Sequence, residues 1–298
     1  MEYHNPVLLK ETVDGLNIRP DGVYVDVTFG GGGHSREIMS RLGENGKLFA
    51  FDQDLDALKN AIDDERFTLI NENFRFIKRF LRFHGIKQVD GILVDLGVSS
   101  HQFDVAERGF STRFDAELDM RMNQKGDISA YHVVNEYDEQ DIARVLFDYG
   151  ELKNARAMAN VIVTARKDKE IRNSDELKKV LAKFLPGHKS NKILAQIYQA
   201  IRIEVNQEMD VLKEFLEQSL EILKPGGRLS VISYHSLEDR LVKRFVKNGM
   251  FEGEPERDFF GNFEVPFKTI EKLIVPSEEE IAINNRARSA KLRVAEKI

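Results

Sequence analysis

The sequence predicts an α/β protein with a mostly parallel, doubly wound, Rossmann-like sheet and an all-helical domain inserted into it. From Val23 to Leu96, short apolar strand patterns alternate with helix patterns, which is typical of parallel strands joined by helices. From about Asp104 to Asn206 the alternation stops, and helix-period patterns replace it. The expected boundaries are 1–103 together with 207–298 for the sheet domain, and 104–206 for the inserted domain, which we expect to recognise substrate.

Each expected element has its own pattern. The first strand, Val23–Phe29, alternates β-branched and other residues and runs into four glycines. Val89–Leu96 is an almost unbroken apolar run, as in buried parallel strands. Apolar residues at helical spacing indicate helices over Asp141–Asp148 and Ala155–Arg166, and Met209–Leu223 reads as a helix stopped by Lys224-Pro-Gly-Gly. Further strands are expected at Lys47–Phe51, Phe67–Asn71, Arg228–Tyr234 and Ala290–Ala295, and a further helix over Phe74–His84.

The glycine run is the strongest functional signal. Glycine has no Cβ, so Gly30 to Gly33 let a ligand approach the backbone closely, and the helix that follows offers free N–H donors. About twenty residues later, the second strand ends in Asp52, where a carboxylate commonly accepts ribose hydroxyls. This order of elements predicts a nucleoside site. The alternative, a tight glycine turn without a ligand, costs about 1 kcal/mol of conformational entropy per glycine.

The nucleoside is not expected to be a dinucleotide. The dinucleotide fingerprint needs Gly or Ala at its sixth position, where this chain has Ser35 or Arg36. A loop of glycines followed by His34 instead suits a ligand without phosphates whose amino-acid part packs on the backbone. S-adenosylmethionine is such a ligand. A nicotinamide-dependent oxidoreductase is the disfavoured alternative.

Two polar residues at strand ends are candidates for the chemistry. Asp95 follows the fourth strand, at the sheet edge where ligands bind, and a carboxylate there can hold the hydrogens of a target amino group in line with a methyl donor. The alternatives are a helix cap or a cofactor contact. His235 follows the fifth strand and either takes the departing proton or packs locally, beside a capping box with the spacing Ser236–Asp239.

Aromatic residues of the inserted region are candidates for base stacking. Phe110 and Phe114 precede Asp119-Met-Arg-Met122, and such rings either stack on an extruded base or belong to the core.

Composition excludes several classes of function. The 298 residues contain no cysteine, which excludes disulfides, thiolate catalysis and cysteine-ligated zinc. Neither a signal-peptide pattern nor a membrane-length apolar run occurs, so we expect a cytoplasmic location. The net charge is −6, yet residues 73–88, 178–192 and the tail from Arg286 carry clustered cations. These clusters either contact phosphates or form solvated helix faces.

Nine motifs in order make the chain closely resemble the MraW/RsmH family, the N4-cytosine methyltransferases of bacterial small-subunit ribosomal RNA. The motifs are His4–Leu8, Gly30–Ser35, Asp90–Ser100, Glu107–Ser111, Leu118–Met122, Gln199–Asn206, Pro225–Ser230, His235–Arg240 and Arg286–Ser289. The resemblance implies a class I methyltransferase fold, S-adenosylmethionine as cofactor, no metal ion, and a decoding-region cytosine of 16S rRNA in the small ribosomal subunit as substrate. The implied cofactor contacts are Gly32, Gly33, His34, Asp52, Phe74, Asp95 and Gln102, and the implied catalytic residues are Asp95 and His235.

The chain departs from the family pattern in the inserted region. Leu152 and Asn154 follow Tyr149-Gly-Glu151, and Gln196-Ile197 stands where Arg-Thr is usual, which affects expected RNA contacts rather than methyl transfer. The Pro-Pro of DNA amine methyltransferases is missing after Asp95, which argues against DNA as substrate. A homodimer is compatible with the sequence. The non-catalytic alternative is a ribosome-assembly factor that binds RNA and keeps the cofactor pocket.

Overall fold

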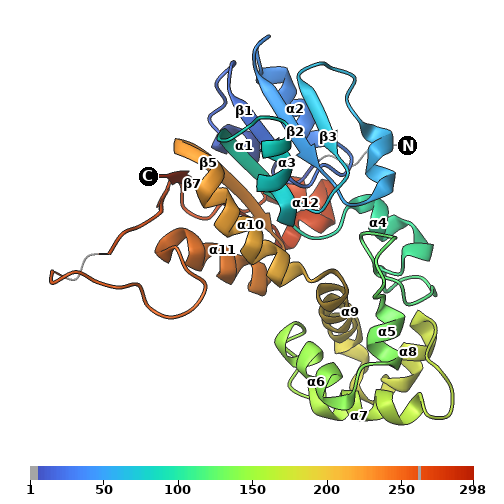
Figure 1. Ribbon diagram of the computed structural model, residues 1–298. Helices are drawn as coiled ribbons and strands as arrows, with labels where there is room; N and C mark the ends of the chain where they lie inside the picture. The colour runs from blue at the N-terminus through green and yellow to red at the C-terminus, as the bar shows by residue number, and fades with distance from the viewer. Residues whose placement is uncertain (1–5, 261–262) are drawn as a thin grey trace. The chain divides into compact units, whose positions relative to one another are not determined.

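The computed structural model describes residues 6–260 and 263–298, so His4 and Asn5 of the first motif lie outside the described residues. The chain divides into two compact units (Figure 1). The sheet unit comprises residues 1–97 and 209–298, and the helical unit comprises 98–208. The helical unit begins at Val98 rather than at the expected residue 104, because Val98 and Phe103 pack against the core of this unit.

The sheet unit contains a seven-stranded sheet in the order β3-β2-β1-β4-β5-β7-β6. Strands β1 to β5 are parallel, β7 runs antiparallel to β5, and β6 runs antiparallel to β7. The expected mostly parallel, doubly wound sheet is therefore confirmed. The strands are β1 (Val23–Asp26), β2 (Lys47–Phe51), β3 (Phe67–Ile70), β4 (Val89–Asp95), β5 (Leu223–Ser233), β6 (Phe267–Thr269) and β7 (Lys291–Lys297).

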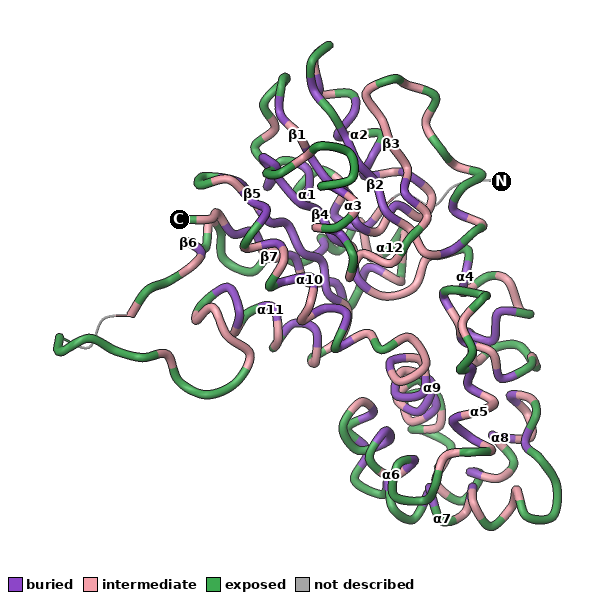
Figure 2. Tube along the Cα trace, viewed as in Figure 1, coloured by how far each residue is buried: buried purple, intermediate pink, exposed green. Residues whose placement is uncertain are grey.

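Helices cover both faces of this sheet because alternate strand residues face opposite sides. Tyr24 and Leu93 pack with one set of helices, whereas their neighbours Val25 and Val94 pack with the other. Figure 2 shows the strands as mostly buried. The first set is α1 (Leu9–Gly15) and α2 (Gly33–Arg41), and the second is α3 (Ile77–Phe83), α10 (Glu208–Ile222) and α11 (Ser236–Asn248). A short helix, α12 (Glu278–Ile283), precedes β7.

Two strand limits differ from the prediction by three residues or more, and β6 was not predicted. β1 ends at Asp26 rather than Phe29, because the chain leaves the sheet to form the glycine loop. β5 begins at Leu223, so Lys224-Pro-Gly-Gly, expected as a helix stop and turn, belongs to the strand. The pairing with β4 shifts register between Val89 and Gly91, which accommodates the extra residues.

The helical unit has its own apolar core, with Met120, Val145, Ile162 and Ile197 all nearly fully buried. Within 98–208 the only strand-like pairing is an isolated bridge between Glu117 and Asn173, in agreement with an all-helical prediction. The helices are α4 (Ser100–Asp104), α5 (Ala130–Asn135), α6 (Glu139–Asp148), α7 (Ala155–Ala165), α8 (Ser174–Val180) and α9 (Ser190–Asn206). Across residues 6–260 and 263–298, no helix combines the length and apolarity needed to cross a membrane.

Candidate active site

The glycine loop between β1 and α2 takes a shape that larger residues would not tolerate. Gly30 and Gly32 have positive φ angles of 50° and 76°, and Gly32 caps the start of α2. A Cβ on Gly32 would lie 2.9 Å from the Phe29 ring, and a Cβ on Gly33 would lie 2.1 Å from Cγ of Pro6. Glycine is therefore required here by both backbone conformation and space.

Polar tethers fix the path of this loop. The Gly30 N–H donates to Oδ2 of Asp52 at 2.7 Å, and the Asn60 amide donates to the Gly30 carbonyl at 3.0 Å. The Arg36 guanidinium donates to the carbonyls of Gly31 and Asn60. The loop is thus held from three sides.

Asp52 directly follows β2, as expected, and its side chain binds the loop. Its other oxygen, Oδ1, accepts the Asp54 N–H at 2.8 Å. Burial raises the pKa of the Asp52 carboxyl to about 6, although these two backbone donors oppose the shift. A carboxylate oxygen has two lone pairs, so each retains one for a ribose hydroxyl.

Asp26, at the end of β1, is a site residue that the sequence analysis missed. Its side chain is completely buried, and the Ser35 hydroxyl donates to Oδ2 at 2.7 Å while the Thr28 N–H donates to Oδ1 at 3.1 Å. Burial raises its pKa to about 6. Asp26 joins the end of the strand to the start of α2, and an acid inside an otherwise apolar strand was the signal for it.

Asp95 ends β4, and two side chains lie beside its carboxyl group. The Tyr234 hydroxyl donates to Oδ1 at 2.8 Å, and Nδ1 of His34 lies 4.0 Å from Oδ2. The Asp95 N–H donates to the Thr28 hydroxyl at 2.7 Å. Burial raises the pKa of Asp95 to about 7, the Tyr234 hydrogen bond opposes this, and the charge of Asp26 adds to it. Near neutral pH this group is balanced between acid and carboxylate.

His34 is a neutral neighbour of Asp95. Its ring is buried, and Nε2 lies 3.2 Å from the Val7 carbonyl oxygen. Because a carbonyl only accepts, Nε2 carries the proton and Nδ1 presents its lone pair toward Asp95. Burial lowers the pKa of His34 to about 4, so the ring adds no charge to the site at neutral pH.

His235 occupies a different local position from the one expected. It is itself the N-cap of α11 and forms a capping box with Glu238, one residue before the expected Ser236–Asp239 pair. Nε2 of His235 lies 3.0 Å from Oε1 of Glu238, whose Oε2 accepts the Tyr234 N–H at 2.8 Å. These contacts give His235 a capping role, and its part in proton removal stays a prediction.

The remaining predicted site residues lie on both units. Phe74 begins a 3-10 turn after β3 and packs edge-on against Phe215, with ring centres 5.3 Å apart. Gln102 belongs to the helical unit, where its Oε1 accepts the Ser99 N–H at 3.0 Å in a capping box at the start of α4. Phe110 is buried in the helical core, whereas Phe114 is 39 % exposed. The contacts of Phe74 and Gln102 with a cofactor stay predictions.

Several cations of the basic clusters form ion pairs that the sequence did not predict. Arg75 pairs with Glu214, Lys78 pairs with Glu221, and both acids come from α10. In the tail, Lys291 and Arg293 both pair with Asp239. These acids lie far away in the sequence, so the clusters appeared unopposed. Such pairing reduces the number of cations available to phosphates.

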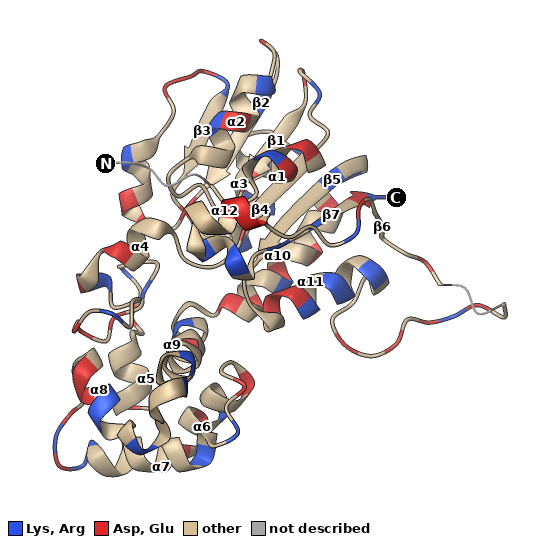
Figure 3. Ribbon diagram, turned by 180° about the vertical axis from the view of Figure 1, so that it is seen from behind, with Lys and Arg blue, Asp and Glu red and all other residues tan. Residues whose placement is uncertain are grey.

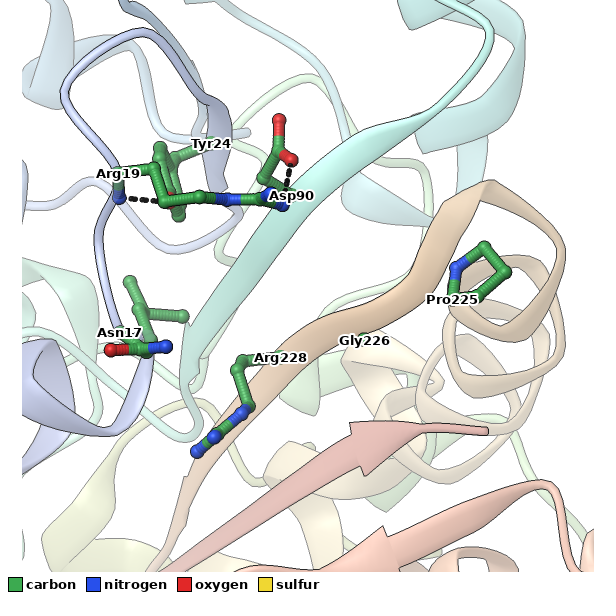
Figure 4. A pocket seen from close by; sticks show the side chains of 8 residues that line it. Asn17, Arg19, Tyr24, Asp90, Pro225, Gly226 and Arg228 are labelled. Atoms are coloured by element: carbon green, nitrogen blue, oxygen red, sulfur yellow. Dashed lines mark hydrogen bonds and ion pairs between the residues drawn. The ribbon is translucent and has the colours of Figure 1, made fainter.

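A hollow of about 200 Å³ lies at the opposite edge of the sheet, where β1 and β4 begin (Figure 4). In it, Asp90 accepts hydrogen bonds from Arg19 at 2.5 Å, from the Val23 N–H at 2.9 Å and from Lys224 at 2.8 Å. These bonds tie three segments together. The hollow is therefore separate from the edge at which Asp52 and Asp95 end their strands.

Comparison with known proteins agrees with this geometry. Residues 1–298 match the MraW methylase family. The "Ribosomal RNA small subunit methyltransferase H" of Flavobacterium johnsoniae is 82% identical over 298 residues, covering 100% of this chain and 99% of that protein. The protein of the same name from Christiangramia forsetii is 68% identical, again over 100% of this chain and 99% of its own length. A solved rRNA methylase from Streptococcus thermophilus aligns with a TM-score of 0.45 and 13% identity, over 100% and 99% of the two chains.

These findings confirm the resemblance inferred from the nine motifs. They also confirm the class of enzyme, a methyltransferase, and S-adenosylmethionine as the cofactor expected from the sequence.

Proposed function

Because the chain belongs to the MraW methylase family, we propose that it transfers a methyl group from S-adenosylmethionine to N4 of a cytosine in the decoding region of 16S rRNA. Two highly similar relatives carry the name of a small-subunit rRNA methyltransferase, which supports the substrate class. The observation that carries the reaction type is the Asp95 carboxyl, held by Tyr234 at the edge where the glycine loop lies.

The residues of the loop fit this cofactor. Glycine is favoured at positions 32 and 33 because a Cβ would meet Phe29 and Pro6, and the absence of side chains leaves backbone on which a ligand can pack. The remaining lone pairs of Asp52 suit ribose hydroxyls, and we propose that Phe74 lies beside the adenine. When bound, S-adenosylmethionine supplies a methyl group activated by its sulfonium.

Asp95 then orients the target. An exocyclic amine of cytosine shares its lone pair with the ring and attacks only when it is drawn toward pyramidal geometry. An ionised Asp95 accepts the amine hydrogens and stabilises the positive charge that develops on nitrogen. The alkylated nitrogen loses a proton readily, and we propose His235 as its acceptor. The helical unit, with Gln102 and the exposed Phe114, is proposed to recognise the RNA.

The test is methylation of small ribosomal subunits from cells that lack the enzyme, with labelled S-adenosylmethionine and digestion of the RNA to nucleosides. We expect label in N4-methylcytidine, and loss of that label in Asp95→Asn even at a saturating concentration of S-adenosylmethionine. Label in another nucleoside would refute the proposed position. Bound cofactor without any label would favour the non-catalytic assembly factor.

A further inference from the structure

The helix α11 separates its charges onto two sides. Both of its acids are buried: Glu238 accepts the backbone N–H of Tyr234, and Asp239 pairs with Lys291 and Arg293. Among its cations, Arg240, Lys243 and Lys247 are exposed, whereas Arg244 is half-buried and donates to the Gly253 carbonyl. Both acids therefore have partners outside their own helix.

The cations form one stripe. Arg240, Lys243, Arg244 and Lys247 recur at intervals of three and four residues, so they share one helical face over about 10 Å. Lys243 and Lys247 are exposed, and no carboxylate among the residues that the structure describes pairs with either. Figure 3 shows acids on the first turns of α11 and cations on the later turns.

The stripe lies on a chain of opposite net charge. The protein carries a net charge of −6, and some cations of its other basic clusters pair with acids, as Arg75 does with Glu214 and Lys178 with Asp175. Surface helices ordinarily intersperse charges of both signs, because like charges one turn apart repel. A face that keeps only cations favours anions as partners.

The stripe also begins close to the candidate active site. α11 starts directly after β5, and Tyr234, which holds Asp95, immediately precedes its N-cap. Arg240 lies about one and a half turns into the helix. Lys243 and Lys247 lie further along, about 12 and 18 Å from the N-cap, so the stripe is placed to follow an RNA strand that leads away from a base at Asp95.

We propose that the α11 stripe (Arg240, Lys243, Arg244 and Lys247) binds the phosphate backbone of the RNA next to the target cytosine. This inference rests on the proposed function and assigns part of the RNA contact to the sheet unit. Two unopposed lysines that each neutralise one phosphate of single-stranded RNA contribute about 1.4 to the slope of log affinity against log salt. At about 0.1 M salt this corresponds to a roughly 25-fold gain in affinity.

The experiment compares Lys243→Ala/Lys247→Ala with wild type. Binding of a fluorescent RNA fragment that spans the decoding region is measured between 0.05 and 0.3 M salt, and KM and kcat are measured on small subunits. We expect about 25-fold weaker binding near 0.1 M salt, a salt slope lower by about 1.4, a raised KM and an unchanged kcat. Calorimetry with S-adenosylmethionine checks that the variant is folded.

The matched control is Lys47→Ala/Lys87→Ala, which removes the same charge just before β2 and at the approach to β4, at the opposite edge of the sheet. We expect wild-type binding from this control. Equal affinity loss in both double variants, or an unchanged salt slope in the α11 variant, would overturn the inference. Wild-type protein that binds the cofactor but fails to methylate small subunits would instead refute the proposed function.

Discussion

Replacing Tyr234 with Phe removes the hydroxyl that donates to Asp95 at 2.8 Å while keeping the ring. Burial raises the pKa of Asp95 to about 7, and the Tyr234 hydrogen bond holds it down. A hydrogen bond to a charged group contributes about 1.5–3 kcal/mol, which corresponds to about 1–2 pKa units. Without the hydroxyl, the pKa of Asp95 is expected to rise to about 8–9.

The reaction needs Asp95 as the ionised acceptor, so the rate rises with pH through the pKa of Asp95. At pH 7 the ionised fraction falls from about one half to about 1–9%, which predicts a methylation rate about 5–50-fold lower. The rate recovers toward pH 9. A bound sulfonium lowers the pKa of Asp95 in both proteins, but the difference between them remains.

The assay is the single-turnover methylation rate from pH 6 to pH 9 at saturating cofactor. Tyr24→Phe is the matched control, because the Tyr24 hydroxyl accepts the Arg19 N–H at the far edge of the sheet. Its pH profile should equal that of wild type. A rate that falls by the same factor at every pH would refute the argument, since Tyr234 would then act without affecting the ionisation of Asp95.

Three further predictions concern stability, measured by chemical denaturation. Burial raises the pKa of Asp26 to about 6, so its contribution to stability is present below about pH 4 and is lost as pH rises through 6. The free energy of unfolding of Asp26→Asn, relative to that of wild type, should therefore rise by about 3 kcal/mol from pH 4 to pH 8. A difference that does not vary with pH would contradict this. Gly33→Ala should cost about 1–3 kcal/mol because its Cβ meets Pro6, whereas Gly187→Ala, with open space around it, should change stability by under about 0.5 kcal/mol. Cations around Asp90 lower its pKa despite burial, so Asp90→Asn should cost about 1 kcal/mol at pH 7 and progressively less in acid, and an equal cost at pH 3 would contradict this.

The sequence predicted the parts of the site that follow from chain order. Parallel strands place their carboxyl ends at one edge, so Asp52 and Asp95 were found from strand patterns alone. Their partners were not, because Tyr234 lies 139 residues from Asp95 and Thr28 lies 67 residues away. No local pattern relates residues that meet only when the sheet is assembled.

The cap of α11 shows a different limit. A capping box was predicted at Ser236–Asp239, although His235–Glu238 has the same spacing. The structure uses the earlier pair. Glu238 also accepts the Tyr234 N–H, and Asp239 pairs with two cations of β7, so tertiary contacts choose between two equivalent local patterns.

The three acids at the strand ends together predict a pH dependence of cofactor binding. Burial raises the pKa of Asp26, Asp52 and Asp95 to about 6, 6 and 7, so part of this edge is protonated near pH 6. S-adenosylmethionine carries a sulfonium charge and offers hydroxyls to Asp52, so it prefers the ionised acids and its binding should release protons. From pH 5 to pH 7.5, affinity should therefore rise about 10-fold through Asp52 and up to about 75-fold through Asp95.

Calorimetry in buffers of different ionisation enthalpy measures that proton release directly. S-adenosylhomocysteine is the matched ligand, because it has the same hydroxyls without the sulfonium charge. Its affinity should still rise with ionisation of Asp52 but should depend less on Asp95, and Asp95→Asn should make the two ligands alike in their pH dependence. Equal proton release for both ligands in the wild-type protein would mean that Asp95 does not sense the sulfonium, and its place opposite the transferred methyl group would have to be abandoned.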